Sequence, residues 1–211
     1  MRGLKPLALV AAGAVLAIAG ALSLPGDMLF SVHMTQHLLL IAVAAPLLVL
    51  GGIRVRVNAI TGWLLFVCIF LFWHWPAAFS WAALHRFGAL LELGSILLAA
   101  LCFWSGVLGP GPLSDGARAL LVMTAAVLTD LPGVVMLFAP TAICIMPHES
   151  AARFGLTPLQ DQQIAGLLMW VPANLVFFGA ATFLFARWMG AISRSPINSS
   201  RPPATDALGS R

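Results

Sequence analysis

The chain alternates long apolar runs with short polar interruptions. Apolar runs occupy residues 5–24, 29–50, 60–79, 88–108, 117–139 and 163–189, and Gly, Pro or charged residues end each of them. A helix needs about 20 apolar residues to cross the hydrocarbon core of a bilayer. The pattern therefore predicts an all-α membrane protein, a bundle of about six transmembrane helices that form one membrane domain over residues 1–189.

The composition excludes most soluble functions. Of the 211 residues, 61% are hydrophobic and 9% are charged, and the mean hydropathy is +0.99, whereas a soluble domain has about 25% charged residues. The sequence contains no GxxxxGK[ST], GxGxxG, GxSxG or HExxH motif, so we expect binding rather than enzymatic catalysis. The net charge of +4 comes from basic residues near helix ends and in the tail. It indicates orientation and contact with anionic membrane lipid, and no binding of nucleic acid.

The basic residues also predict the topology. With the N-terminus in the cytoplasm, nine of the eleven Lys and Arg residues face inside, and only Arg86 and Arg153 face outside. Both termini are therefore expected to be cytoplasmic. The first run is either a retained helix or a cleaved signal peptide, since Ala17-Ile18-Ala19 resembles a cleavage site. The other helices keep their orientation in either case. Residues 190–211, rich in Ser, Pro and Arg, predict a disordered cytoplasmic tail.

All histidines fall on the predicted outer side. His33 and His37 are four residues apart, so in a helix they project from one face and could share a metal ion. His74, within Trp-His-Trp-Pro, lies at a similar depth near the end of its run. The alternative is that these are interfacial residues bonded to water, headgroups or Gln36. His85 and His148 lie in the outer loops.

Acidic residues accompany the histidines. Glu92 and Asp161 are on the outer side near helix starts, and Asp130 lies about nine residues, or roughly 13 Å, below the outer end of its run. A carboxylate at such depth usually faces a partner inside the bundle. The candidates are the histidines, a metal that they hold, or Gln162 and Gln163. Alternatively, Asp130 is neutral or bonds to backbone groups freed by a nearby proline.

A third set of possible ligands lies in the loop between the last two runs. Cys144, Met146 and His148 alternate in Cys-Ile-Met-Pro-His, and alternate side chains of an extended segment share a face. Thiolate, thioether and imidazole together favour Cu(I) over hard ions. Their spacing alone is not specific.

Several segments in order carry a resemblance to a known family. They are SVHMTQHLLL at 31–40, AAPLLVLG at 44–51, FWHWP at 72–76, LELGS at 91–95 with FW at 103–104, and DQQIAGLLMWVP at 161–172. Over about residues 30–190 the chain resembles the CtaG-type cytochrome c oxidase assembly factors associated with caa-type oxidases.

This resemblance implies a multi-pass protein of the bacterial plasma membrane that is needed to make active cytochrome c oxidase. Its expected partners are oxidase subunits or other assembly factors, and its expected cargo is copper, handled on the outer side. In that family a histidine often follows the helix-four glutamate, whereas this chain has Leu93. The predicted metal-binding residues are His33, His37, His74, Glu92, Asp161, His148, Cys144 and Met146.

Two alternatives stay open at this point. One is a haem-binding electron-transfer protein, in which histidines of the second and third runs are axial ligands. The other is a metal-free membrane chaperone or transporter, in which the buried acids serve helix packing or proton movement.

Overall fold

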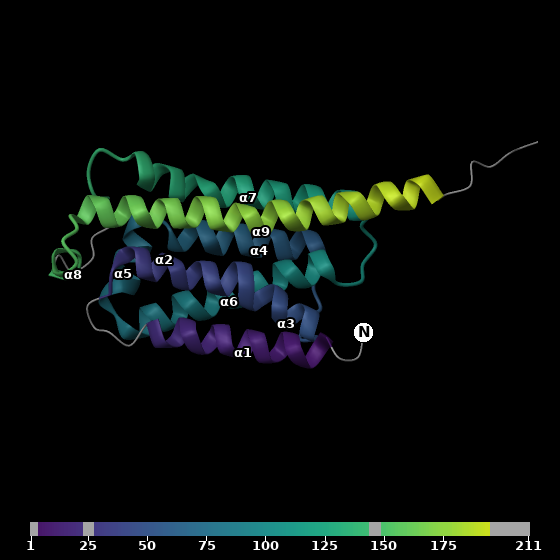
Figure 1. Cartoon of the computed structure of the whole chain (residues 1–211), viewed down its shortest axis with the longest axis horizontal. Helices are drawn as coiled ribbons and strands as arrows, with labels where there is room; N and C mark the ends of the chain where they lie inside the picture. The colour runs from purple at the N-terminus through teal and green to yellow at the C-terminus, as the bar shows by residue number, and fades with distance from the viewer. Residues whose placement is uncertain (1–3, 23–27, 144–148, 195–211) are drawn as a thin grey trace, which may run out of the picture.

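The fold was examined in a computed structural model, which describes residues 4–22, 28–143 and 149–194 (Figure 1). This part of the chain is helical, with no strand. The elements are α1 (Leu4–Leu22), α2 (Phe30–Leu38), the π-helix η1 (Leu39–Ala44), α3 (Ala45–Gly51), α4 (Ala59–Trp73), α5 (Pro76–Leu84), α6 (Arg86–Leu108), α7 (Asp115–Phe138), α8 (Glu149–Arg153) and α9 (Pro158–Arg194).

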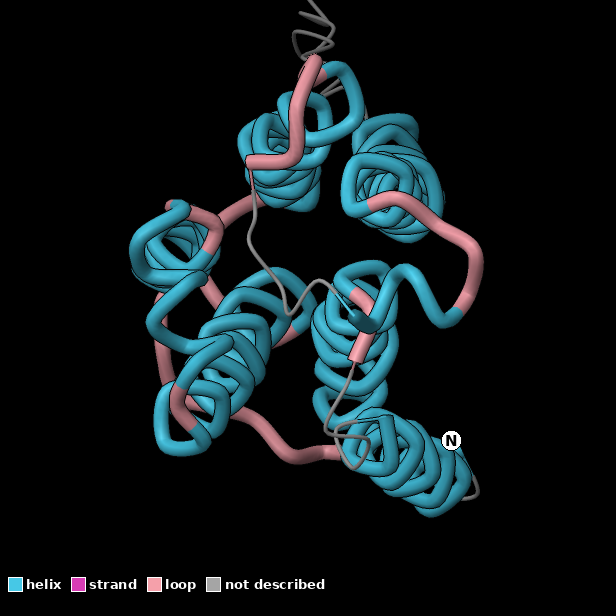
Figure 2. The backbone as a smooth tube through the Cα atoms, turned by 90° about the vertical axis from the view of Figure 1, so that its left-hand side faces the viewer, coloured by secondary structure: helices cyan, strands magenta, loops and turns pink. Residues whose placement is uncertain are grey.

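The helices confirm an all-α membrane protein with about six spans. Five stretches are long and apolar enough to cross a membrane: α1, the continuous α2–η1–α3, α6, α7 and α9. The pair α4 and α5, bent by 73°, gives a sixth span if the two helices are counted as one broken span. Seen from the end, the spans form a ring in which α2–η1–α3 contacts α9, α9 contacts α7, α7 contacts α4, and α4 contacts α6, which returns to α3 (Figure 2). Helix α1 lies outside this ring, against α3 and η1.

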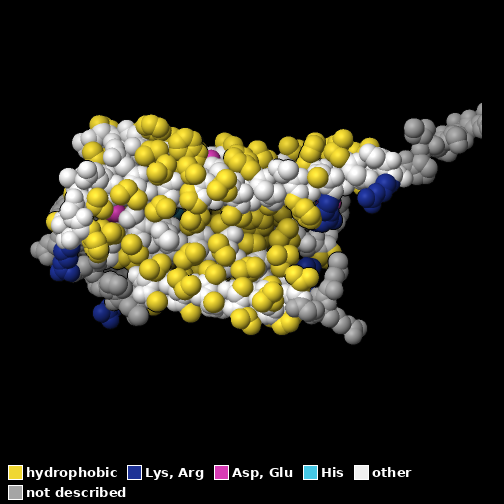
Figure 3. Space-filling view, viewed as in Figure 1, with side chains coloured by type: hydrophobic (Ala, Val, Ile, Leu, Met, Phe, Trp, Pro, Cys, Tyr) yellow, Lys and Arg dark blue, Asp and Glu magenta, His cyan; other side chains and the backbone are white. Residues whose placement is uncertain are grey.

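The surface fits a bilayer. Apolar side chains cover the middle of the visible face, and the Lys and Arg side chains lie at its two ends (Figure 3). Helix α1 begins and α9 ends at the same end of the bundle, whereas α5 and α8 lie at the opposite end, here called the α5 end (Figure 1). This arrangement agrees with an even number of spans.

Close contact between α7 and α9 depends on glycine. A Cβ atom on Gly166 would lie 2.5 Å from the carbonyl oxygen of Gly133, which is nearer than real Cβ atoms come. Small residues let helix backbones approach in a membrane, where van der Waals packing drives association. This contact sets the position of α9, which also packs against α2.

The second span is not a regular α-helix. In η1 the backbone N–H of Ala45 donates to the carbonyl of Leu40, a π-helical pairing. The same register would pair the carbonyl of Ile41 with Pro46, which has no N–H. The indole Nε1–H of Trp104 donates to that carbonyl instead, at 2.8 Å. A side chain of α6 therefore stabilises the π-helix just below the histidines of α2.

Two predicted boundaries differ from the structure. The run at 60–79, expected to be one helix, is broken between α4 and α5, because Pro76 disfavours helical backbone at Trp75, which has φ −72° and ψ 130°. The last helix runs from Pro158 to Arg194 rather than over 163–189. It therefore includes the start of the predicted tail, and residues 195–211 lie outside the described part.

Candidate metal centre

Three potential metal ligands meet at the α5 end of the bundle. His33 and His37 come from consecutive turns of α2, and Glu92 comes from the second turn of α6. Their ligand atoms all lie within 4.8 Å of one another. No other group of three or more His, Cys, Asp or Glu residues in the described part of the chain has this geometry. All three side chains are buried, and Glu92 is only 1% exposed.

The distances in this group suit a single ion. Oε1 of Glu92 lies 3.1 Å from Nε2 of His33 and 3.4 Å from Nε2 of His37. Two ligand atoms about 2.0–2.1 Å from a tetrahedral ion are about 3.4 Å apart. A small ion could therefore bind all three side chains after small side-chain adjustments.

Several buried polar atoms here have no hydrogen-bond partner within the described residues. They are Oε2 of Glu92, Nδ1 of His37 and Nε2 of His74, and Nε2 of His37 has only its 3.4 Å contact with Glu92. Each buried polar atom without a partner costs about 1–3 kcal/mol, and a buried carboxylate costs more unless a cation neutralises it. The described partners of the Glu92 side chain are the imidazoles of His33 and His37. A bound cation could satisfy Oε2 of Glu92, Nε2 of His74 and one nitrogen of His37, but not both His37 nitrogens, because they point in different directions.

His74 lies beside the group, at the C-terminus of α4. Its ring stacks on Phe70 and contacts the ring of His37, with centroids 5.4 Å apart in the latter pair. Nδ1 of His74 lies 2.7 Å from the carbonyl oxygen of Phe70. A carbonyl can only accept, so Nδ1 carries the proton, and in the neutral ring Nε2 has the free lone pair. Metal-binding histidines are commonly oriented by such a backbone bond. The break before Pro76 places His74 at this helix end.

The structure gives Asp161 a different position from the histidines. Its carboxylate, in the first turn of α9, accepts the backbone N–H groups of Phe30 and Ser31, at 2.8 and 3.0 Å. These are orphan donors at the start of α2, where the helix dipole also favours a negative charge. The residue before α2, Leu29, supplies no side-chain cap. Asp161 therefore anchors the helix that carries His33 and His37.

The remaining predicted residues lie elsewhere. Cys144, Met146 and His148 are outside the described residues. The exposed His85 has Nδ1 hydrogen-bonded to the carbonyl of Trp81. Asp130, expected to face the histidines or the glutamines after Asp161, instead accepts a hydrogen bond of 2.8 Å from Nδ2 of Asn174 in α9.

Sequence reasoning missed the residues that surround the histidines. Phe79 of α5 contacts the edge of His33, with centroids 5.7 Å apart, and Phe70 stacks on His74. Trp104, in α6, donates a hydrogen bond to a backbone carbonyl of η1. In the sequence, the only indication that Phe79 lies near the histidines was its position shortly after Trp-His-Trp-Pro. The Trp104 contact joins residues 63 positions apart, which no local pattern reveals.

Comparison with protein families identifies the chain. The family described as cytochrome c oxidase caa3 assembly factor matches residues 8–55 and 52–191. The chain belongs to this family. The match covers all six spans, including the histidine pair, Glu92 and Asp161. Comparisons of this assembly factor with curated proteins and with solved structures found no match.

Proposed function

We propose that this assembly factor binds a copper ion through His33, His37 and Glu92, with His74 as an additional ligand, and passes it to an oxidase subunit in the bacterial plasma membrane. The observation that carries the proposal is the buried group of two imidazoles and one carboxylate whose ligand atoms lie within 4.8 Å of one another, with Oε2 of Glu92 left without a hydrogen-bond partner among the described residues. The proposed activity is binding and transfer, with no covalent catalysis.

The ligand set favours a metal with high affinity for imidazole. Imidazole suits Cu, Zn, Fe and Ni. The family's association with cytochrome c oxidase, an enzyme that contains copper, selects copper from this set. His148, Cys144 and Met146 remain possible additional ligands in the proposal, since the loop that carries them follows α7.

The geometry favours an ion over haem. His33 and His37 lie side by side on one helix, with ring centroids 4.6 Å apart, and His37 meets His74 edge to face. Neither pair presents two parallel imidazoles across a gap. The cavity beside His37 has a volume of about 30 Å³, whereas a pocket for a large organic ligand has about 300–1,000 Å³. A larger hollow of about 670 Å³ borders His74, but His74 is the one histidine in its lining.

The proposed site faces the outer side of the membrane. The charge distribution of the sequence supports this orientation, and the structure places the loop after α7 at the α5 end. Single cysteines at Thr141 and Pro112, in a chain whose native cysteines are replaced by serine, would test it. An impermeant maleimide applied to intact cells should label Thr141→Cys and leave Pro112→Cys unlabelled. The reverse pattern would place the site in the cytoplasm.

Metal analysis of the detergent-purified protein tests the copper site directly. The wild type should retain copper after gel filtration, and X-ray absorption should show nitrogen and oxygen ligands. His33→Ala/His37→Ala should lose this copper. His85→Ala is the matched control, because His85 is an exposed histidine at the same end of the bundle, and it should bind as the wild type does.

The same variants distinguish the alternatives in cells. Under copper delivery, His33→Ala/His37→Ala fails to support oxidase assembly while His85→Ala supports it. A haem protein would show a visible absorption band that His33→Ala/His37→Ala removes. A metal-free chaperone would bind neither group, and the double variant would assemble active oxidase.

A further inference from the structure

A cavity inside the helix ring lies next to the proposed copper site. It is enclosed by α2 and η1, α4, α7 and α9, and it has a volume of about 30 Å³. Its lining includes His37, two methionines, Met34 and Met169, and three phenylalanine rings. Met34 and His37 are three residues apart on α2 and therefore share a helix face. Met169 enters from α9, which is next to α2 in the ring.

His37 borders both the proposed copper site and this cavity. Its Nε2 lies 3.4 Å from Oε1 of Glu92, and the ring nitrogens of an imidazole point in different directions. Nδ1 therefore points away from the carboxylate, and it has no hydrogen-bond partner among the described residues. The His37 side chain is 2% exposed. This buried, unpartnered nitrogen lines the cavity and is therefore available to a ligand there.

Water is a poor occupant of this cavity. A volume of about 10–15 Å³ is enough for one water molecule, but a buried water needs two to four polar partners. Apart from His37, the polar side chain in the lining is Thr129, whose hydroxyl already donates to carbonyl oxygens of its own helix. The sulfur atoms of Met34 and Met169 are only weak acceptors. The Thr129 oxygen can still accept, so the lining offers a water molecule at most two good hydrogen bonds, the lower limit for a buried water.

A soft monovalent cation fits the same lining. Thioether and imidazole ligands select Cu(I), and all of these ligands are neutral, so no anion within the cavity would stabilise a divalent ion. Phe66, Phe70 and Phe177 line the cavity, and aromatic faces attract cations. The carboxylate of Glu92, across the His37 ring, adds a compensating negative charge.

We propose that Met34, His37 and Met169 form a second, deeper site for Cu(I) beside the first. A neutral imidazole has one free lone pair, so with both sites filled Nδ1 of His37 binds the deeper ion, Nε2 keeps its proton toward Glu92, and His33, Glu92 and His74 hold the first ion. This inference rests on the proposed function, because it extends the same copper path into the bundle. The two sites differ in donor type: nitrogen and oxygen at the first, nitrogen and sulfur at the second. Sulfur ligation is therefore the signature of the deeper site.

The test counts Cu(I) bound by the full chain in detergent under anaerobic conditions, with a chromogenic Cu(I) chelator as competitor. All proteins carry Cys144→Ser and Met146→Leu, which removes sulfur ligands of the loop. The parent should bind two Cu(I) per chain, and X-ray absorption should show sulfur. Met34→Leu/Met169→Leu, nearly isosteric, should bind one Cu(I) and show no sulfur.

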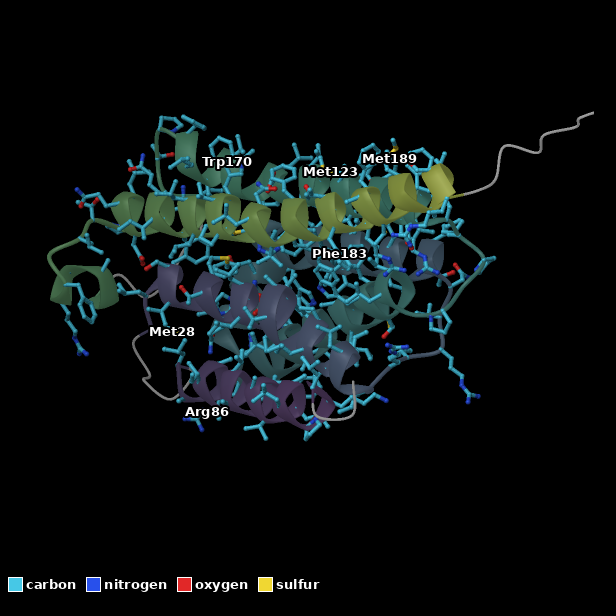
Figure 4. The ribbon with its side chains drawn as sticks, turned by 45° about the vertical axis from the view of Figure 1, so that its right-hand side comes forward. Met28, Arg86, Met123, Trp170, Phe183 and Met189 are labelled. Carbon is cyan, nitrogen blue, oxygen red and sulfur yellow. The ribbon has the colours of Figure 1, made fainter. Side chains whose placement is uncertain are left out.

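Two further variants complete the test. Met136→Leu removes a methionine that is equally buried but does not line the cavity, and it should bind two ions. The exposed Met123 and Met189 lie on the outside of the bundle (Figure 4) and stay unchanged. His33→Ala/Glu92→Gln should keep one Cu(I) with sulfur ligation.

The outcomes separate the two proposals. A parent protein that binds one ion without sulfur, unaffected by Met34→Leu/Met169→Leu, would overturn the deeper site and leave the first site standing. A parent that binds only a sulfur-ligated ion, lost in the methionine variant, would support the deeper site against the first. Binding of no copper would refute both. The spectrum of the parent decides these outcomes even if a variant fails to fold.

Discussion

The substitution Glu92→Gln separates a metal centre from a structural ion pair. In the metal-free protein the Glu92 carboxylate is 1% exposed and its described partners are two imidazoles. If the site is built for a cation, this charge is incompletely compensated until the cation binds. Glutamine has the same shape and no charge, and its amide can still bond to either imidazole. We therefore expect Glu92→Gln to leave the metal-free protein as stable as the wild type, or more stable.

The expected effect on copper binding is large. Removing one partner of a buried charged pair costs about 2–5 kcal/mol, and 1.4 kcal/mol corresponds to a factor of ten in Kd. The Kd for copper should therefore rise at least about 30-fold. At a free copper concentration about 100 times the wild-type Kd, binding stabilises the wild type by about 2.7 kcal/mol. The same relation gives about 0.9 kcal/mol for a variant that binds 30-fold more weakly.

The assay is thermal unfolding in detergent micelles with and without Cu(I), followed by intrinsic tryptophan fluorescence. Copper should raise the Tm of the wild type clearly, and the Tm of Glu92→Gln much less. A metal-free Glu92→Gln protein that unfolds at a markedly lower temperature would show that the carboxylate and imidazoles form a structural ion pair. An undiminished copper response in the variant would exclude Glu92 as a ligand.

Three other predictions follow from the fold. Asp161→Ala leaves two buried amides at the start of α2 without an acceptor, so the free energy of unfolding should fall by about 2–6 kcal/mol. Denaturation in mixed micelles measures this loss, and the affinity for copper should fall as well. Trp104→Phe removes the hydrogen bond to the π-helix and should cost about 1–3 kcal/mol in the same assay, with unchanged stability contradicting its role. Gly166→Leu should reduce the yield of folded protein on gel filtration, because α7 and α9 can no longer approach each other. Gly179→Leu is the control: no atom lies near the added Cβ, so the yield should not change.

The sequence allowed the spans and part of the site to be predicted for a local physical reason. Apolar length determines whether a helix can cross the bilayer, and i, i+4 spacing places two side chains on one helix face. The rings of His33 and His37 do lie together, 4.6 Å apart. Glu92 faces them, as expected of an acid near the start of an apolar helix.

The remaining features depend on contacts between distant segments. Asp161 resembled a ligand in the sequence because it lies on the predicted outer side, yet its oxygens accept amides 130 and 131 residues away. Asp130 has Asn174 as its partner, a pairing that follows from the glycine contact between α7 and α9. The metal roles of all these residues stay predictions until copper is measured.

The π-helix has a genetic consequence. A π-helical turn contains one residue more than the α-helical turn that would replace it, so deletion of one residue within 39–44 could restore a regular helix. That shorter span would still be long and apolar enough to cross the membrane. Because the wider turn takes up the extra residue, the segments on either side of it would keep roughly their present faces, and His33 and His37 would still face Glu92. A chain shortened here should keep both its membrane insertion and its binding group, whereas a one-residue deletion in a regular helix would rotate one part against the other by about 100°.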